Sequence, residues 1–268
     1  MTGAQAKIEA RSVGLRYEGV DGMPAFTALQ ETSFHIEEGQ FVCLVGPSGC
    51  GKTSLLKAIA GLHKVTSGKI FVNGNVISEP GLDRAVVFQY DSLLPWRNVF
   101  KNALLGWNIR GGDKQIYEAK TREYLKLVGL EKFQNYYPHQ LSGGMRQRVN
   151  LARALAIEPD ILLMDEPFAA LDAQTREIMQ AELLRIWGAT RKTVIFVTHQ
   201  VDEAVFLADR VLVMGTRPGR VIDDIRIDFA RPRDLVLKTT PAFNAITEKI
   251  WSNLARENER LKEADAAA

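Results

Sequence analysis

The sequence predicts an α/β fold with a mainly parallel core sheet. Five short apolar runs lack the polar alternation of half-buried strands, which is typical of strands covered on both faces. Helical patterns separate several of these runs, and such alternation of strands and helices indicates an α/β core. The expected core strands are 41–45, 85–88, 161–164, 193–197 and 210–214. The expected helices are 52–60, 115–128, 142–156 and 172–187, and Gly61, Gly129 and Gly188 mark three of the helix ends.

An antiparallel β part is expected in the N-terminal region. Residues 7–17 and 27–36 alternate apolar and polar side chains, which is the pattern of half-buried strands. Residues 69–77 contain Asn73-Gly74 between two short β-type runs, and this dipeptide is a strong hairpin signal.

The chain also contains two segments outside this strand–helix pattern. Residues 90–140, approximately, contain no clear strand, which favours a mostly helical subdomain inserted between two sheet strands. Beyond residue 214 the pattern weakens, with a turn at 217–220 and an exposed, charged helix at 247–263. We therefore expect a flexible N-terminus at 1–7, a main domain at 8–214 and a C-terminal extension at 215–268.

Composition is that of an ordinary soluble globular protein. The 268 residues are 46% hydrophobic and 25% charged, and a net charge of +2 is too small to argue for nucleic acid. No stretch approaches the roughly 18 apolar residues of a membrane helix, and residues 1–7 lack the apolar segment of a secretory signal. Cys43 and Cys50 make no disulfide framework, so a reduced cytosolic setting is expected.

A complete phosphate-loop motif lies between an expected buried strand and an expected helix. Residues 46–53 match G-x-x-x-x-G-K-[ST], in which glycines let the backbone wrap phosphate oxygens. Lys52 is expected to contact the β- and γ-phosphates, and the Thr53 hydroxyl to bind Mg²⁺. Alone, the motif indicates a nucleoside triphosphate and no particular reaction. The predicted nucleotide-binding residues here are Gly46, Pro47, Ser48, Gly49, Cys50, Gly51, Lys52, Thr53 and Ser54.

Two acidic residues follow the apolar run 161–164. Ligands of parallel sheets bind beyond the C-terminal ends of the strands, where Asp165 and Glu166 are expected to lie. Asp165 is a candidate Mg²⁺ ligand. Glu166 is a candidate to polarise the water that attacks the γ-phosphate.

A second anion site is expected at residues 141–148, Leu-Ser-Gly-Gly-Met-Arg-Gln-Arg. Ser142 suits the N-cap of the following helix, and Gly143 and Gly144 expose backbone N–H groups at a helix start. One chain rarely needs two such sites for one nucleotide. The economical interpretation is that this segment serves the nucleotide held by a second copy of the chain.

Together these segments resemble an ABC transporter ATPase. Residues 141–145 resemble the LSGGQ signature, with Met at the last position. The order of motifs also matches, since the phosphate loop, Gln89, the signature, Asp165-Glu166, Ala-Ala-Leu-Asp at 169–172 and His199 follow one another. The resemblance covers about 8–214. It implies the P-loop NTPase fold of an ABC cassette, with ATP and Mg²⁺ as bound species and ATP hydrolysis as the reaction.

The resemblance assigns roles to further residues. Tyr17 resembles the aromatic residue that stacks on adenine, and Gln89 resembles the residue that touches Mg²⁺ and the attacking water. His199 resembles the switch histidine that contacts the γ-phosphate, and Asp172 resembles an aspartate at the dimer interface. The implied catalytic residues are thus Glu166, His199 and Gln89, and the implied metal ligands are Thr53, Gln89 and Asp165.

The resemblance also implies partners. Two copies would sandwich two ATP molecules, each between one phosphate loop and residues 142–144 of the other copy. Residues 93–99, Leu-Leu-Pro-Trp-Arg-Asn-Val, are similar to the importers of nitrate, taurine and aliphatic sulfonates, and so are 201–210, 217–220 and 231–234. The implied partners are a second ATPase subunit, two transmembrane permease subunits and an extracytoplasmic solute-binding protein, at the cytoplasmic face of the plasma membrane. A motor for another imported solute and an exporter motor are the alternatives.

Leu93, Leu94 and Trp96 have two interpretations. This region of the family faces the membrane subunit, so the three side chains are candidates for an apolar groove that receives a coupling helix. The alternative is that they fill the core of the helical subdomain.

Other ABC classes fit the sequence less well. The DNA-repair type needs a long coiled coil between phosphate loop and signature, and no heptad run appears there. The translation-factor type carries two cassettes in one chain, whereas this chain has one. A non-catalytic scaffold would be expected to lack Glu166 or His199, and both are present.

Overall fold

The structure, a computed structural model, describes residues 6–19, 24–90 and 92–267. The chain divides into two compact units. The first unit comprises Met1–Gly81 and Thr193–Ala268, and the second unit comprises Leu82–Lys192. Of the expected flexible segment 1–7, residues 1–5 lie outside the described residues, and residues 6 and 7 belong to strand β1 (Ala6–Tyr17).

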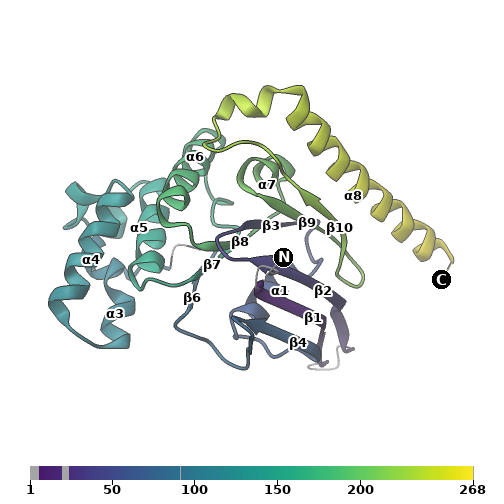
Figure 1. Ribbon diagram of the computed structural model, residues 1–268, viewed down its shortest axis with the longest axis horizontal. Coiled ribbons are helices and arrows are strands. Elements are labelled where there is room, and N and C mark those ends of the chain that lie inside the picture. The colour runs from purple at the N-terminus through teal and green to yellow at the C-terminus, as the bar shows by residue number, and fades with distance from the viewer. Residues whose placement is uncertain (1–5, 20–23, 91, 268) are drawn as a thin grey trace, which may run out of the picture. The chain divides into compact units, whose positions relative to one another are not determined.

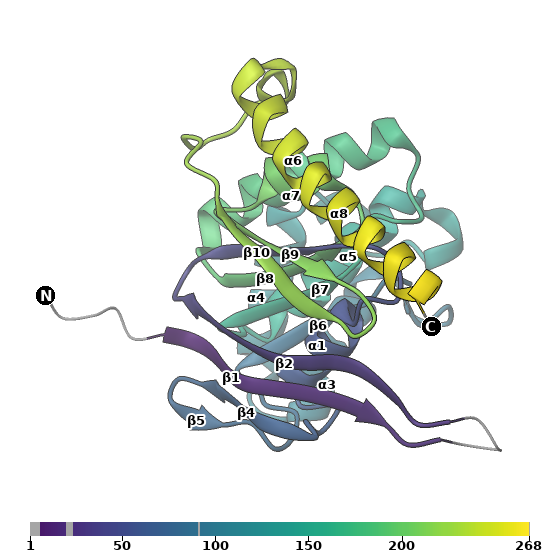
Figure 2. The same ribbon diagram turned by 90° about the vertical axis from the view of Figure 1, so that its right-hand side faces the viewer.

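The first unit contains the expected antiparallel sheet. Its strands lie in the order β2 (Phe26–Glu37), β1, β4 (Ser67–Val72) and β5 (Asn75–Val76), as Figure 2 shows. Asn73 and Gly74 join β4 to β5 with φ angles of 50° and 77°. Left-handed backbone at both central residues is what an Asn-Gly hairpin turn requires, so the predicted hairpin is confirmed.

Three of the five predicted core strands lie in the first unit and pair in parallel. Strand β3 (Phe41–Val45) pairs in parallel with both β8 (Thr193–Thr198) and β9 (Arg210–Gly215). Every residue of β3 and β8 is buried, as expected of strands covered on both faces. Helices α1 (Lys52–Ile59) and α7 (Val201–Leu207) follow β3 and β8 along the chain (Figure 1).

Strand β10 (Arg220–Arg226) was not predicted. It pairs antiparallel with β9, and together they form a hairpin around the expected turn at 217–220. Val221 and Ile222 are adjacent, as are Asp223 and Asp224, so apolar and polar side chains do not alternate along it, and its register also shifts there. The pairing with β9 therefore forms this strand without a clear pattern in its own sequence.

The C-terminal helix differs from its prediction in length and in burial. Helix α8 spans Pro241–Ala267 and follows the 3₁₀ helix η3 (Leu235–Thr239), whereas the sequence predicted an exposed helix over 247–263. The Thr240 hydroxyl accepts the N–H of Phe243 at 3.3 Å, and Pro241 occupies the first helical position, where proline is favoured. Phe243, Ile250 and Leu254 are buried, so one face of α8 packs against the unit.

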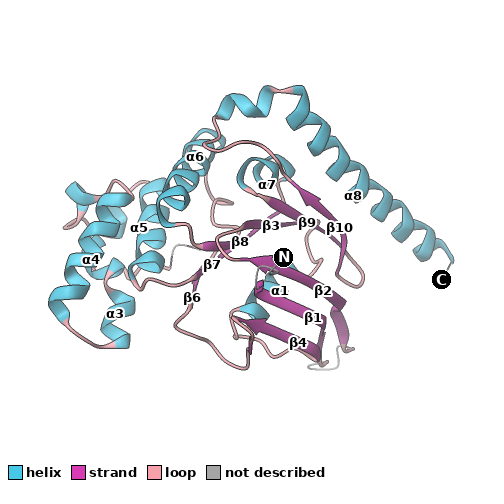
Figure 3. Cartoon of the chain, viewed as in Figure 1, coloured by secondary structure: helices cyan, strands magenta, loops and turns pink. Residues whose placement is uncertain are grey.

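The second unit contains the parallel strands β6 (Arg84–Val87) and β7 (Ile161–Asp165). Helix α5 (Gly143–Ala156) precedes β7 and α6 (Ala173–Thr190) follows it. Between β6 and α5 the described residues form no strand, as Figure 3 shows. The elements there are α2 (Val99–Ala103), α3 (Leu105–Arg110), α4 (Lys114–Leu127) and the 3₁₀ helices η1 (Glu131–Phe133) and η2 (Pro138–Gln140). That this segment acts as a subdomain of its own stays a prediction.

Aromatic side chains fill the core of the helical segment. Trp107 stacks on Tyr117 with ring centroids 3.6 Å apart. Its indole N–H donates to the carbonyl of Ala156 at 2.7 Å, which ties α3 to the end of α5.

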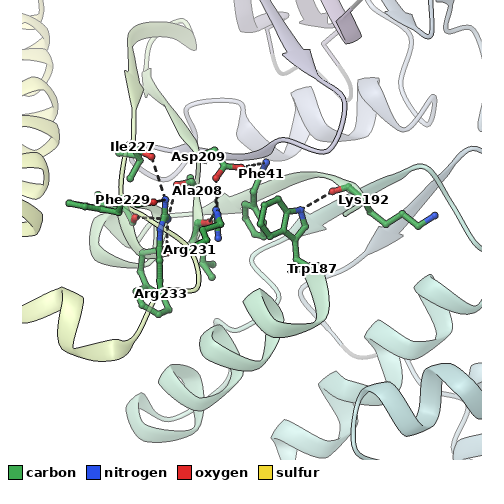
Figure 4. A network of polar contacts seen from close by, with 12 residues as sticks. Phe41, Trp187, Lys192, Ala208, Asp209, Ile227, Phe229, Arg231 and Arg233 are labelled. Carbon is green, nitrogen blue, oxygen red and sulfur yellow. Dashed lines mark hydrogen bonds and ion pairs between the residues drawn. The ribbon is translucent and has the colours of Figure 1, made fainter. Parts of the chain in front are cut away.

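Helix α6 continues past its predicted end. Gly188 lies inside the helix, and the last turn closes where the N–H of Arg191 donates to the carbonyl of Trp187 at 2.7 Å. Arg191 has a φ of 49°, so it takes the left-handed position at which glycine is usual. The indole N–H of Trp187 then donates to the carbonyl of Lys192 at 2.8 Å (Figure 4).

The prediction of an α/β fold with parallel core strands and an N-terminal antiparallel part is therefore confirmed. Within the described ranges, none of the helices has both the length and the apolar character needed to cross a membrane.

Candidate nucleotide-binding site

The phosphate loop leaves the C-terminal end of β3 and enters α1 at Lys52. Gly49 and Gly51 have φ angles of 78° and 87°, which other residues rarely adopt. A Cβ at Gly51 would also lie 2.7 Å from the carbonyl oxygen of Ala28 in β2. Both glycines are thus required by the backbone path, as the motif predicted.

Lys52 lies inside the curve of this loop. The ammonium group donates to the carbonyls of Gly46 and Pro47 at 2.8 and 2.9 Å and lies 3.6 Å from the Sγ of Cys50. Only 5% of the residue is exposed. Burial raises the pKa of Cys50, and this effect exceeds the opposite effect of the Lys52 charge. The loop therefore presents a buried positive charge beside a protonated thiol.

Tyr17 lies at the end of β1, next to the helix that the loop feeds. Its hydroxyl donates to the Oγ of Ser54 at 3.0 Å and lies 2.9 Å from Nδ1 of His63. Its ring stacks on Phe26, with centroids 5.1 Å apart and planes 18° apart. Phe26 is 59% exposed and lies opposite Tyr17 in the β1–β2 register, so the two rings form one aromatic platform. Phe26 and His63 were not predicted from the sequence, and only the strand register identifies Phe26.

His199 directly follows β8, which is paired with β3. In the parallel register Val45 lies opposite Thr198, so Gly46 and His199 are the first residues beyond the same edge of the sheet. The Thr198 hydroxyl donates to the carboxylate of Glu203 and accepts the N–H of Gln200 at 3.0 Å. Glu203 is 3% exposed and was not predicted as a site residue. The first unit thus brings together the phosphate loop, Tyr17 and the segment that carries His199.

The second unit brings together Gln89 and the acidic pair. Val87 of β6 lies opposite Met164 of β7, so Gln89 and Glu166 each follow that pair by two residues at the same sheet edge. Asp165 is 9% exposed at the end of β7. Glu166 has a φ of 44°, and left-handed backbone at a residue other than glycine is often found at functional sites.

The predicted second anion segment lies in the same unit, at the start of α5. Ser142 is the N-cap, and its Oγ accepts the N–H of Met145 at 3.2 Å. Gly144 is buried, and a Cβ there would lie 3.0 Å from a methyl group of Thr175 in α6. The glycines therefore also allow α5 to approach α6, a reason that the sequence analysis did not give.

Asp172 is the N-cap of α6. Its carboxylate accepts the N–H of Thr175 at 3.0 Å, and hydrogen bonds from the Thr175 N–H and hydroxyl lower the pKa of Asp172. The acid is thus ionised at neutral pH and holds the first turn of α6.

The donor set predicted for Mg²⁺ suits that ion. A threonine hydroxyl, an amide oxygen and a carboxylate are the hard oxygen ligands that Mg²⁺ prefers. Within the part of the chain that the structure describes, no group of three or more His, Cys, Asp or Glu side chains is placed to hold a metal. Of Thr53, Gln89 and Asp165, only Asp165 is a residue of that kind, so the three would not form such a group. The magnesium site stays a proposal.

The comparison with protein families decides the identity. The sequence model of the family described as ABC transporter matches residues 29–169, more than half of the chain. This chain belongs to the ABC transporter family. The match includes the phosphate loop, Gln89, the signature and the acidic pair of this ABC protein.

Relatives of known sequence support the same assignment. This ABC protein is 51% identical over 230 residues to the uncharacterised ABC transporter ATP-binding protein MJ0412 of Methanocaldococcus jannaschii, covering 86% of this chain and 85% of that protein. It is 50% identical over 228 residues to the taurine import ATP-binding protein TauB of Rhizobium johnstonii, covering 83% and 87%. The taurine import relative is consistent with the importer group that the sequence resembles.

A solved structure matches the fold. The ATP-binding cassette MJ0796, described as a dimer in a post-hydrolysis state with ADP and phosphate bound, is 31% identical to this ABC protein. The match covers 83% of this chain and 100% of that one, with a TM-score of 0.71. The chain therefore has the fold of an ABC ATP-binding cassette.

The apolar residues of the loop after Gln89 differ in burial, and this difference distinguishes their two interpretations. Leu93 is buried, so it contributes to the interior of the second unit. Leu94 is half-buried, and its N–H and carbonyl are bonded to the Asn102 side chain at 2.8 and 3.1 Å. Trp96 is 72% exposed, so of the three it is the candidate for a contact with another protein.

Proposed function

We propose that this chain hydrolyses ATP to ADP and phosphate and thereby powers an ABC importer of taurine or a related solute. The ATPase proposal is carried by the phosphate loop, with Lys52 inside its curve and the two left-handed glycines that shape it. The proposed solute is supported by the 50% identity to the taurine import protein of Rhizobium johnstonii. Nitrate and aliphatic sulfonates are the related solutes of the same importer group.

Each proposed catalytic residue has a chemical task. Lys52 and the backbone N–H groups of the loop hold the phosphates and offset their charge. Glu166 orients the attacking water and accepts its proton as the oxygen bonds to the γ-phosphorus. The bond from that phosphorus to the bridging oxygen breaks, and ADP leaves. Gln89 and His199 position the water and the γ-phosphate.

Magnesium is part of this proposal. Thr53, Gln89 and Asp165 would hold it, and the ion would supply positive charge that offsets the negative charge of the phosphates. The half-buried Tyr17 and the exposed Phe26 would receive the adenine ring on their aromatic platform.

A second copy is proposed to complete the nucleotide site. Ser142, Gly143 and Gly144 of one copy would contact the ATP held by the loop of the other. The relative MJ0796 forms a dimer as a cassette, which supports this arrangement. ATP would then favour the closed pair, and hydrolysis would release it.

The remaining partners follow from the importer proposal. Two transmembrane permease subunits would provide the path through the membrane, with an extracytoplasmic protein to deliver the solute. The chain would lie at the cytoplasmic face of the membrane and bind no nucleic acid. The exposed side chain of Trp96 is proposed to face the permease.

Growth of a deletion strain tests the importer proposal. The gene is deleted, and growth is measured with taurine or an alkanesulfonate as sole sulfur source and with nitrate as sole nitrogen source. We expect a defect on taurine that wild-type protein rescues and Glu166→Gln does not. Normal growth on all three would leave the family assignment intact and would refute the proposed solute group.

A further inference from the structure

We propose that Arg233 is a positioning residue for His199, because it caps the C-terminal end of α7, whose N-cap Gln200 is the residue after this histidine. The inference rests on the proposed ATPase function, in which His199 contacts the γ-phosphate. It gives the C-terminal extension, which lies outside the matched segment 29–169, a task in hydrolysis.

The guanidinium of Arg233 binds the last carbonyl groups of α7. It donates to the carbonyls of Phe206 and Ala208 at 2.8 Å each, and to that of Val205 at 3.4 Å. Helix ends leave such carbonyls without partners inside the helix, and a cation there also complements the negative end of the helix dipole. Arg233 thus supplies bonds that α7 itself cannot make.

Arg231 completes the cap. It donates to the carbonyl of Leu207 at 2.7 Å. It also pairs with the carboxylate of Asp209, as Figure 4 shows. The same carboxylate accepts the N–H of Phe41, the first residue of β3, at 2.9 Å. The two arginines therefore satisfy four consecutive carbonyls and connect the end of α7 to the strand that leads to the phosphate loop.

The burial of Arg233 shows that this contact is built into the fold. The residue is 8% exposed, and its guanidinium lies 5.9 Å from the ring centre of Phe229. Burial lowers the pKa of Arg233 to about 10, with a smaller lowering by Arg231, so the side chain is charged at neutral pH. A buried charge is costly unless it is hydrogen-bonded, and here one terminal nitrogen donates to the α7 carbonyls while the other donates to the carbonyls of Ile227 and Phe229 at 3.4 Å. The buried Nε of Arg233 has no hydrogen-bond partner among the described residues.

His199 lies just before the opposite, N-terminal end of α7. Gln200 is the N-cap, and residues Thr198 and Glu203 hold the preceding turn by the hydrogen bonds described above. Lys238 of η3 lies 4.0 Å from the Asp202 carboxylate and 5.0 Å from the ring centre of Phe206. A seven-residue helix is only about 10 Å long, so a shift at its capped end moves the end next to His199.

Three variants separate this role from general stabilisation of the fold. Arg233→Met removes the cap, and Arg233→Lys keeps a charge that reaches fewer carbonyls. Arg226→Met is the matched control, because Arg226 lies near the same segment but pairs with Asp228 while both side chains are largely exposed. Thermal unfolding of each variant is measured first, and Arg233→Lys is the variant retained if Arg233→Met does not fold.

Steady-state kinetics give the first readout. We expect kcat for ATP to fall about tenfold in Arg233→Met and less in Arg233→Lys, since small misplacements of reacting groups lower rates strongly. The KM for ATP should change by less than about twofold, because the phosphate loop is intact and ground-state binding is retained. Arg226→Met should match the wild type.

Imidazole resonances give the second readout, which does not need turnover. The chain has four histidines, so the signal of the carbon-bound ring protons of each histidine is assigned by replacing that histidine alone. We expect the His199 signal to shift in both Arg233 variants while those of His63 and His139 stay in place. This readout tests the positioning role even if the wild type does not hydrolyse ATP. Absence of hydrolysis by the wild type would refute the proposed function and not the contact between Arg233 and α7.

Two outcomes would overturn the inference. A folded Arg233 variant with the wild-type kcat would show that the cap does not matter for hydrolysis. A lower kcat with an unmoved His199 signal would show that Arg233 only stabilises the unit.

Discussion

Two cations of the first unit, Lys52 and Arg233, are buried and held by main-chain carbonyl groups. Lys52 binds the carbonyls of its own loop, whereas Arg233 binds carbonyls of a helix far from it in the chain. The motif predicted Lys52, because all its partners lie within six residues. Residues 231–234 resemble the importer group, but no local pattern indicates the role of Arg233, whose partners are brought to it by tertiary structure.

Replacing Lys52 tests the phosphate loop. Lys52→Ala should weaken ATP binding by about 1.5–3 kcal/mol, because it removes a charge-assisted contact to the phosphates. Titration calorimetry with ATP measures the loss, with Lys57→Ala in the same helix as the control. Equal ATP affinities for Lys52→Ala and the wild type would argue against the assigned role.

Among the elements, the β9–β10 hairpin contacts the phosphate loop. Gly219 approaches that loop so closely that a Cβ would lie 2.2 Å from the carbonyl oxygen of Cys50. Arg220, the next residue, pairs with Glu257 of α8 at 2.7 Å. Helix α8 is thus connected to the loop through two residues of the hairpin.

The pH dependence of stability tests this connection. Burial raises the pKa of Glu257, but hydrogen bonds from Arg260 and Arg220 outweigh it, so the net pKa lies below the ordinary value of 4.5. A lowered carboxyl pKa stabilises the fold above the unfolded-state value, and the stabilisation is lost as the pH falls through the folded-state value. We therefore expect the unfolding temperature of the wild type to fall more steeply below about pH 4.5 than that of Glu257→Gln.

Thermal melts across this pH range measure the difference. Glu259→Gln, on the exposed side of α8, is the control and should follow the wild type. Parallel curves for the wild type and Glu257→Gln would contradict the proposed contribution of the pair.

The elements also show where sequence patterns were sufficient. Strands β3 and β8 were predicted because every position is buried, which leaves an uninterrupted apolar run. Strand β10 was not predicted because apolar and polar residues do not alternate along it. Helix α8 begins before its predicted start because the helix-start signal at Thr240-Pro241 precedes the charged pattern of 247–263. In the candidate site, motifs identified the loop and the acidic pair, whereas Phe26 follows only from strand register.

For the whole molecule, the proposed site residues are divided between the two units. The first unit carries the phosphate loop, Tyr17 and His199, and the second carries Gln89, the acidic pair and the signature segment. The proposed hydrolysis needs both sets, together with the signature of a second copy. ATP is therefore expected to control how the chain assembles as well as to be its substrate.

The Glu166→Gln variant tests this central claim most directly, with Glu248→Gln on the exposed side of α8 as the control. Turnover and molecular mass are measured with and without Mg²⁺ and ATP. We expect Glu166→Gln to bind ATP as the wild type does and to form a stable dimer only with ATP. Its rate should fall by at least about 100-fold, because a general base contributes at least that factor. A Glu166→Gln variant that stays monomeric with ATP and hydrolyses it at the wild-type rate would contradict the account.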